Sequence, residues 1–204
     1  MKYNFAYFNF EITIRSGIIL EKLYFEAIKL CCPHLKVWNE SKFKISRHAM
    51  DMSSNQDNKD LLETECPYGQ AVLIKRRPKT RQIDLITYNE EKKTICSYEI
   101  KRGGGHHDSE KQEKILENLF AVRLLLKSYG IKKGLEVEKA RSYIISHMNQ
   151  ELFSPDYRFF QIDGKEINEH FKADVMSSLE EGYSYFTSEF KKKFNELKRL
   201  ANQF

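Results

Sequence analysis

The sequence predicts an α/β fold in which one helix is followed by a three-stranded antiparallel meander, a second helix and a further strand. Hydrophobic residues recur at helical spacing on both sides of a central stretch. That stretch contains three runs rich in Val, Ile, Thr and Tyr, and the links between them are short enough to favour hairpins. The chain has 204 residues, 41% of them hydrophobic, which is enough for one core and a small appendage.

The amino-terminal part contains one predicted helix and one predicted insertion. Residues 5–14 are expected to be extended, and Ser16 is expected to cap a helix that runs to about Cys31, because apolar residues then recur at steps of three and four. Pro33 ends this helix. The polar segment near 33–68 is expected to have little regular structure.

The central part supplies the predicted sheet. The three strands are expected at 70–76, 81–88 and 93–101. A strong helix begins at Asp108 or Ser109, where Ser109 and Gln112 have the spacing of a capping box, and a further strand is expected at 141–147. These elements form the predicted core, residues 1–150.

Residues 151–204 are predicted to form a carboxyl-terminal helical extension. A short strand is expected at 158–162, and a long helix runs from about 174 to the end. The helix has a continuous apolar stripe, made by Leu179, Tyr183, Phe186, Phe190, Phe194, Leu197 and Leu200. Two alternatives remain open: the stripe packs on the core, or it forms the interface of a homodimer.

Composition restricts the possible partners and location. The chain has 34 Lys+Arg against 29 Asp+Glu, and this net charge of +5 permits a polyanionic partner without requiring one. A secretory signal and a membrane span are not evident, so a soluble, cytoplasmic protein with no membrane partner is expected. The four cysteines form no C-x-x-C pair and are expected to be reduced thiols; a zinc site of Cys31, Cys32, His34 and Cys66 is the alternative.

Three charged residues on neighbouring predicted strands suggest a catalytic site. Asp84 lies within an apolar run, and Glu99 and Lys101 flank Ile100 on the next strand. Because strand side chains alternate between faces, Glu99 and Lys101 point the same way. If the hairpin places Asp84 with them, two carboxylates and an ammonium converge, and the Ile100 carbonyl is available as a further metal ligand.

This set of groups suits phosphodiester hydrolysis. The reaction needs an activated water, neutralised phosphate charge and a stabilised leaving group, and a hard cation supplies most of this. Mg2+ or Mn2+ prefers oxygen ligands, and one or two carboxylates on rigid strands anchor it while water and phosphate complete the shell. Lys101 would orient or deprotonate the attacking water, or stabilise the phosphorane.

Asp84 followed by Glu99-Ile100-Lys101 in this order of elements resembles the PD-(D/E)xK nuclease superfamily, which includes many restriction endonucleases and archaeal Holliday-junction resolvases. The resemblance covers roughly residues 16–148. It implies a restriction-endonuclease-like core in which Asp84 and Glu99 bind the metal and Lys101 assists the nucleophile. Glu21, a turn after Gly17, matches a supporting metal ligand of the first helix, with a solvent-facing glutamate as the alternative. Ile83 stands where the family pattern has proline.

The residues around this predicted site include candidates for DNA contact. Basic residues crowd the turn before the Asp84 strand, and a glycine-rich loop with two histidines follows Lys101. Such groups can bind phosphates, and their alternative is a solvated surface. The candidates are Lys75, Arg76, Arg77, Lys79, Arg81, Arg102, His106 and His107.

The sequence therefore predicts an Mg2+-dependent endonuclease acting on double-stranded DNA, with a type II restriction endonuclease as one form. Alternatives within the enzyme class are a Holliday-junction or repair nuclease and a mobile-element nuclease subunit. A non-catalytic DNA-binding or assembly module on the same fold is the alternative outside it. A protein that handles RNA or a small-molecule phosphate is a third possibility. Participation of Gln112 is left open, because it is equally a capping residue.

Overall fold

The computed structural model describes residues 5–54, 64–69, 73–74, 77–78, 80–102, 109–153 and 155–201. Its elements in chain order are α1 (Phe5–Cys31), β1 (Leu35–Lys44), α2 (Arg47–Ser53), β2 (Leu73–Ile74), β3 (Arg77–Pro78), β4 (Thr80–Asn89), β5 (Thr94–Lys101), α3 (Ser109–Lys132), β6 (Lys139–Ser146), η2 (Pro155–Phe160), β7 (Gln161–Asp163), η3 (Gly164–Glu166), α4 (Ile167–Phe171) and α5 (Val175–Ala201). The predicted α/β class is confirmed.

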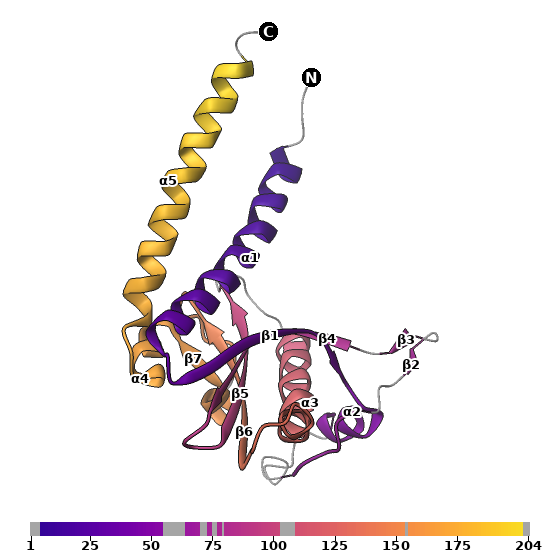
Figure 1. Cartoon of the computed structure of the whole chain (residues 1–204). Coiled ribbons are helices and arrows are strands. Elements are labelled where there is room, and N and C mark those ends of the chain that lie inside the picture. Colours follow the sequence, from indigo (N-terminus) through magenta and orange to yellow (C-terminus); the bar gives the residue numbers. More distant parts are fainter. Residues whose placement is uncertain are drawn as a thin grey trace.

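One mixed five-stranded sheet forms the centre of the molecule (Figure 1). Its strand order is β1-β4-β5-β6-β7, in which β1, β4 and β5 are antiparallel neighbours. The pairs β5–β6 and β6–β7 are parallel, and α3 makes the crossover from β5 to β6. The short β2–β3 hairpin stands apart from this sheet.

Helices cover both faces of the sheet because the apolar side chains of its strands alternate. Ile95 of β5 packs with Leu125 and Tyr129 of α3 on one face. Ile100 of the same strand packs on the other face with Tyr24 of α1 and with residues of α4 and the start of α5. Odd and even positions of β5 thus serve two separate clusters, as strand geometry requires.

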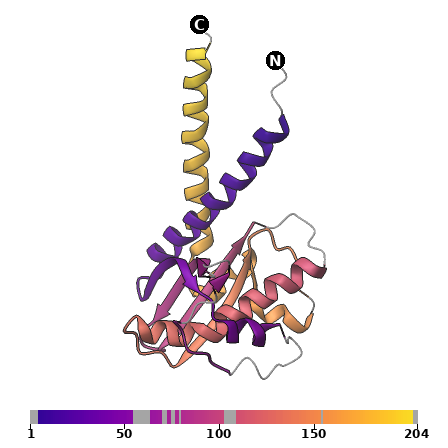
Figure 2. The same ribbon diagram turned by 90° about the vertical axis from the view of Figure 1, so that its right-hand side faces the viewer.

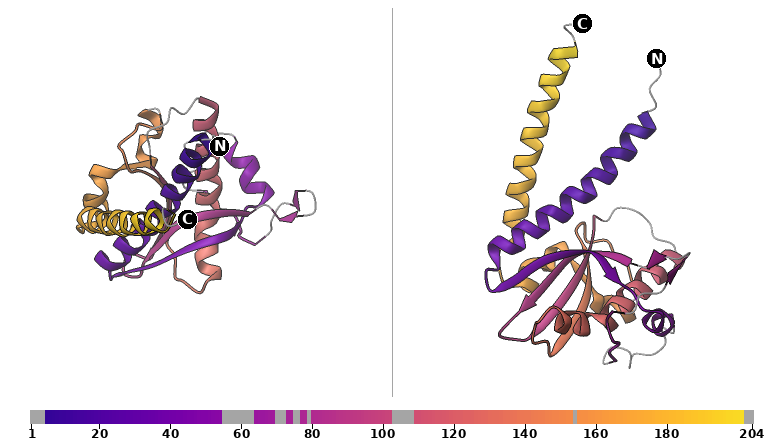
Figure 3. Two further views of the ribbon diagram at one scale, coloured as in Figure 1. Left: turned by 90° about the horizontal axis from the view of Figure 1, so that it is seen from above. Right: turned by 45° about the vertical axis from the view of Figure 1, so that its right-hand side comes forward.

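The long helices α1 and α5 leave the body of the protein as two arms, and both chain ends lie at their far tips (Figures 1 and 2). The first turns of α5 pack on α1 so closely that a Cβ at Gly182 would lie 2.8 Å from Leu23 Cδ2. Farther along, Tyr183 is 55% exposed and Phe190 is 54% exposed. The two helices then diverge, as the two views of Figure 3 show.

The apolar stripe on α5 is therefore buried in its first part and exposed farther along the helix. Leu179 is buried in the core beside α1, so its first part packs on the core. Phe186 and Phe190 stack on each other in solvent, with ring centroids 6.2 Å apart. The side chains of Phe194, Leu197 and Leu200 lie outside the described residues.

The expectation of an extended segment at 5–14 and a helix cap at Ser16 is wrong. Helix α1 begins at Phe5 and runs through these positions as 27 continuous residues. Neither Gly nor Pro occurs before Gly17 to stop it.

The expectation of an irregular insertion near 33–68 is also wrong. Strand β1 lies in this segment and pairs with β4 from Leu35↔Asn89 to Lys44↔Thr80, and α2 follows it. As an edge strand β1 tolerates many polar residues, which hid it in the sequence. The first strand of the antiparallel trio is thus β1, whereas the described residues of the run at 70–76, Leu73 and Ile74, form β2 in the separate hairpin.

The remaining predicted elements are close to those observed. Strands β4, β5 and β6 and helices α3 and α5 match their predicted segments within a few residues. The expected strand at 158–162 is corrected to the short helix η2 followed by the three-residue strand β7. The side chain of Ser109 lies outside the described residues, so its capping role remains a prediction.

Among the described residues, none of the helices combines the length and apolar character that a membrane span requires.

Candidate functional site

The predicted site residues lie where β4 and β5 part. The antiparallel ladder between these strands reaches Leu85↔Tyr98. Asp84 precedes Leu85 on β4, and its Oδ2 atom accepts a hydrogen bond from the backbone N–H of Ile100 at 2.9 Å. A side-chain carboxylate thus occupies the gap where the next ladder partner would otherwise be. Asp84 reaches between the strands rather than standing on one face of the sheet.

A β-bulge explains why the strands part at this place. Along β1 and β4, Trp38 pairs with Ile86 whereas Glu40 pairs with Ile83, so residues 84–85 of β4 oppose one residue of β1. A bulge of this kind bends its strand, ends regular pairing and redirects side chains. It therefore directs Asp84 to the gap, while Ile83 and Ile86 both stay buried in the α3-side cluster.

Glu99 and Lys101 form an ion pair beside this gap. Lys101 Nζ lies 2.7 Å from Glu99 Oε1, and both side chains are partly exposed. Ile100 between them is buried in the cluster on the α1 side. The strand alternation predicted from the sequence accounts for this arrangement.

The surroundings of the site raise the pKa of two of its carboxyl groups, Glu21 and Asp84. Burial raises the pKa of Asp84 above its usual value and Glu99 raises it further, whereas the Ile100 N–H and Lys101 lower it. Burial also raises the pKa of Glu21, and Asp84 adds to the increase. Because Glu99 disfavours ionisation of Asp84, and Asp84 and Glu99 disfavour ionisation of Glu21, a cation placed among them would relieve this repulsion.

Glu21 reaches the site from α1 through a residue that the sequence analysis missed. Gln82 Nε2 lies 3.4 Å from Glu21 Oε2 and 3.3 Å from Asp84 Oδ1, so one amide bridges the two acids. Glu21 is partly exposed, so its role as a supporting ligand and the alternative of a solvent-facing glutamate paired with a neighbour both remain predictions. The feature of the sequence that could have identified Gln82 was its position two residues before Asp84 on the same strand.

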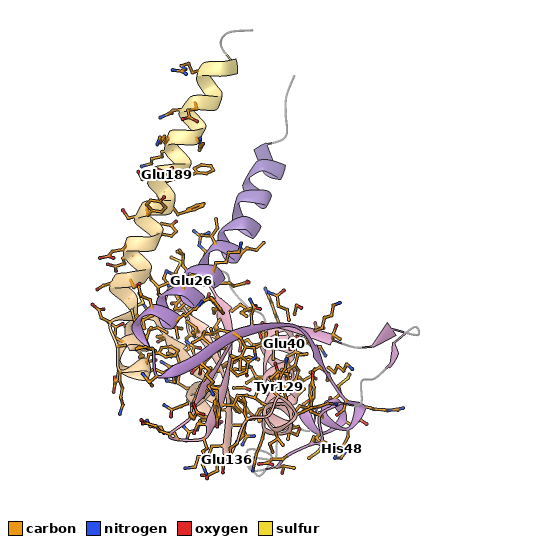
Figure 4. All side chains as sticks on the ribbon, viewed as in Figure 1. Glu26, Glu40, His48, Tyr129, Glu136 and Glu189 are labelled. Atoms are coloured by element: carbon orange, nitrogen blue, oxygen red, sulfur yellow. The ribbon has the colours of Figure 1, made fainter. Side chains whose placement is uncertain are left out.

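A pocket of about 660 Å³ opens beside Glu21 and Asp84, between α1 and strands β1 and β4. Figure 4 labels Glu26 on α1 and Glu40 on β1, which also line it. Four acidic residues face this pocket against one lysine, so it attracts cations. The lining residues are Ile18, Glu21, Lys22, Phe25, Glu26, Asn39, Glu40, Ser41, Gln82 and Asp84.

The oxygen donors at the site fit a divalent cation in kind. Ile100 directs its N–H toward Asp84, and in a strand the carbonyl of a residue points to the same edge as its N–H. The Ile100 carbonyl, Asp84 and Glu99 are hard oxygen donors of the type that Mg2+ prefers. In the part of the chain that the structure describes, however, no group of three or more His, Cys, Asp or Glu is arranged to hold a metal. The donors present therefore suit Mg2+ in their chemical kind.

The alternative zinc site is wrong. Cys66 packs in the cluster on the α3 side of the sheet, whereas Cys32 packs in the cluster on the α1 side. All four cysteines are free thiols. The predicted ligands therefore do not gather at one place.

The candidate DNA-binding residues are placed only in part. Lys75, Arg76, Lys79, His106 and His107 lie outside the described residues, and Arg77 belongs to the small hairpin. Arg102 is exposed at the end of β5. Arg81 is partly buried; burial lowers its pKa, while nearby Glu99 favours its charged form.

His147, at the end of β6, is a second neighbour whose role the sequence analysis did not identify. Its backbone N–H donates to the Lys101 carbonyl at 2.9 Å, and its Nδ1 lies 3.0 Å from the Tyr24 hydroxyl. Burial and the charge of Arg102 lower its pKa. His147 could have been identified from its place in the chain, because the parallel strands β5 and β6 end at the same edge of the sheet.

Comparison of the chain with protein-family models, with curated proteins and with solved structures finds no match. The functional interpretation therefore rests on the geometry and chemistry of the residues described above.

Proposed function

We propose that this protein is a divalent-metal-dependent DNA endonuclease of the PD-(D/E)xK type. The observation that carries the proposal is the convergence of Glu21, Asp84, Glu99 and Lys101 where β4 and β5 part. The order α1, three antiparallel strands, α3 and a parallel β6 supports the same interpretation. It agrees with the order of elements expected of a restriction-endonuclease-like core.

Asp84, Glu99 and the Ile100 carbonyl would hold Mg2+ or Mn2+, with Glu21 as a supporting ligand. The cation lowers the pKa of a bound water and neutralises phosphate charge when it is present. Lys101 lies beside Glu99, where its ammonium can orient the attacking water or stabilise charge on the phosphorane. Gln82 holds the carboxylates of Glu21 and Asp84 in place relative to each other.

Double-stranded DNA is the substrate we propose, with Arg81 and Arg102 among the groups near the phosphates. Cleavage of both strands of a duplex is served by two active sites in a homodimer. The exposed aromatic side chains of Tyr183, Phe186 and Phe190 on α5 provide a surface for a second copy. A type II restriction endonuclease is one form of this proposal, and a junction, repair or mobile-element nuclease is another.

A non-catalytic binding or assembly module on the same fold is the second candidate. The ion pair between Glu99 and Lys101 favours it, because this pair already satisfies one of the proposed ligands. The acidic pocket beside Asp84 argues against it as a plain DNA-binding surface, because a polyanion is repelled there.

A plasmid assay distinguishes the two candidates. Purified protein is incubated with supercoiled plasmid and Mg2+, and Asp84→Ala and Lys101→Met are compared with Glu169→Ala, a change at an exposed position of α4. We expect the parent and the α4 control to nick or linearise the plasmid, and the two site variants to remain folded and inactive. Equal cleavage by all four proteins would reveal a contaminating nuclease and overturn the assignment. No cleavage by the folded parent with Mg2+ or Mn2+ would favour the non-catalytic module.

A further inference from the structure

The charges of α5 are divided unevenly between the two halves of the helix. Residues 175–190 contain three glutamates and neither lysine nor arginine. Residues 191–201 contain five lysines or arginines and one glutamate, Glu196, whose Oε2 lies 3.0 Å from Lys193 Nζ. With this internal ion pair included, the first half of the helix is acidic and the second half is basic.

The apolar positions of the same helix are spaced symmetrically about Phe190. Phe186 and Phe194 lie four residues before and four residues after it in the sequence. Tyr183 and Leu197 lie seven residues before and seven residues after it. Steps of four and seven residues return to nearly the same side of a helix, so these positions belong to one narrow stripe. The spacing of the stripe is therefore the same when the helix is followed in either direction.

The described aromatic side chains of this stripe are exposed to solvent. Tyr183, Phe186 and Phe190 are 55%, 37% and 54% exposed. They lie on the part of α5 that extends beyond the body of the protein, where Figure 4 labels Glu189. Soluble monomers rarely expose a large continuous apolar patch, and a helix gains most of its stability from the packing of its apolar face. This part of α5 is consequently suited to a partner.

Charged side chains border the stripe on both halves of the helix. Residues three apart are neighbours on a helix surface. Glu180 lies three residues before Tyr183, and Glu189 lies three residues after Phe186. Lys193 lies three residues after Phe190. A helix that packs against the stripe therefore meets acidic groups along its first half and basic groups along its second half.

We propose that α5 binds α5 of a second copy of this chain in an antiparallel pair centred on Phe190. In a twofold-symmetric pair the same surface of each copy meets, so both helices must supply matching positions. Antiparallel packing about Phe190 sets the positions four and seven residues before it against those four and seven residues after it. It also lays the acidic half of each helix along the basic half of the other.

The charge pattern distinguishes this arrangement from a parallel pair. In a parallel pair each residue faces its own counterpart, so the three glutamates of both copies would gather at one end and the basic residues at the other. Like charges brought together across an interface are destabilising, and charges beside an apolar seam select the orientation of paired helices. The spacing of the stripe permits both orientations, and the charges favour the antiparallel one.

The antiparallel orientation determines where the two proposed nuclease sites lie. Helix α5 begins at the body of the protein and ends at the far tip of its arm (Figure 1). With Phe190 at the centre, the two copies of Val175 are roughly 45 Å apart at about 1.5 Å per residue. The bodies therefore lie at opposite ends of the paired helices. The inference rests on the proposed homodimer for its partner, but it does not depend on the metal chemistry.

Sedimentation velocity of the full chain, without DNA or divalent metal, tests this proposal separately from the cleavage assay. We expect the parent to dimerise and the dimer to weaken as NaCl is added, because salt screens attraction between exposed charges. A parallel pair would be strengthened by salt, since its charges repel. A parent that stays monomeric, even one that binds DNA or vesicles of anionic lipid through its basic half, would overturn the proposal.

Small-angle X-ray scattering of the dimer provides a second measure of orientation. Two bodies at opposite ends of the paired helices should give a distance distribution with a separate maximum at or beyond roughly 45 Å. A single maximum from two adjoining bodies would indicate the parallel pair and overturn the proposal.

Charge reversal on α5 tests the complementarity of its two halves. Glu180→Lys with Glu189→Lys, and separately Lys191→Glu with Lys193→Glu, are each expected to weaken dimerisation at least tenfold. All four changes together exchange the signs of the two halves and should restore the dimer, a recovery that misfolding cannot produce. Double variants that dimerise like the parent, or a fourfold variant that stays monomeric, would overturn the proposal.

The matched control reverses two charges away from this helix. Glu91→Lys with Glu169→Lys changes the net charge by the same amount as the first double variant, at two exposed positions outside α5. We expect this control to dimerise like the parent. Equal weakening by the control and by the α5 variants would show a general effect of net charge and overturn the assigned surface.

Discussion

Replacing Asp84 by Ala and by Asn separates the structural contribution of this carboxylate from its chemical one. Asp84 Oδ2 accepts the N–H of Ile100, a residue that is only 5% exposed. The Ala variant removes this acceptor from a buried donor, which costs about 1–3 kcal/mol of unfolding free energy. For a chain of this size the melting temperature falls by roughly 2–4 °C for each kcal/mol.

The Asn variant has a different expected stability. The amide oxygen of Asn can still accept a hydrogen bond from the Ile100 N–H. The substitution also removes a carboxyl group whose pKa is raised mainly by burial. A carboxyl group with a raised pKa in the folded state binds more protons folded than unfolded, so stability falls as pH rises through the folded pKa. At neutral pH we therefore expect Asp84→Asn to be at least as stable as the parent, with an advantage that shrinks in acid.

Thermal denaturation followed by circular dichroism, with and without excess Mg2+, measures these effects. Bound cation stabilises the folded state by mass action, so Mg2+ should raise the melting temperature of the parent and of neither variant. If Asp84→Asn loses as much stability as Asp84→Ala, the hydrogen-bond argument is refuted. If Mg2+ raises all three melting temperatures equally, the proposed role of Asp84 as a ligand is refuted.

Three further predictions concern other parts of the molecule. Gly164→Ala should destabilise the fold, because its Cβ would collide with the His147 carbonyl oxygen. Gly17→Ala, in open space within α1, should stabilise the fold by about 0.5–1 kcal/mol. Chemical denaturation measures both changes, and equal effects would contradict the packing argument. If the protein forms the proposed homodimer through α5, the parent should sediment as a dimer and Phe190→Ser as a monomer; an unchanged mass would exclude this part of α5 from the interface. Without added metal, burial is expected to hold the pKa of Glu21 and of Asp84 above the ordinary carboxyl range, which NMR titration measures. Asp84→Asn should lower the pKa of Glu21, because the charge of Asp84 contributes to the increase; an unchanged pKa would remove Glu21 from the site.

Local patterns were sufficient to predict much of the core. The apolar spacing of α3 and the alternating residues of β4, β5 and β6 led to segments close to those observed. The same alternation placed Glu99 and Lys101 together, and the structure has them as an ion pair. These features depend on neighbours within one element, so the order of residues alone carries the information.

Features that depend on distant partners were missed or misjudged. Strand β1 looks like a polar loop in the sequence, because an edge strand leaves many side chains in solvent and is defined by its pairing with β4. Residues 5–14 alternate like a strand, yet they form helix because no breaker precedes Gly17. The bulge at residues 84–85 is likewise a property of two paired strands.

The sequence by itself determined the α/β class, the central strands and the acids and lysine that suit phosphodiester chemistry. Only the tertiary structure decided that Asp84 enters the gap between two parting strands, that Gln82 joins it to Glu21, and that β6 pairs with β7 from Ile144 to Ser146. The physical reason is that side-chain periodicity is set within a single element. Strand pairing, bulges and sheet edges are set by contacts between segments that are far apart in the chain.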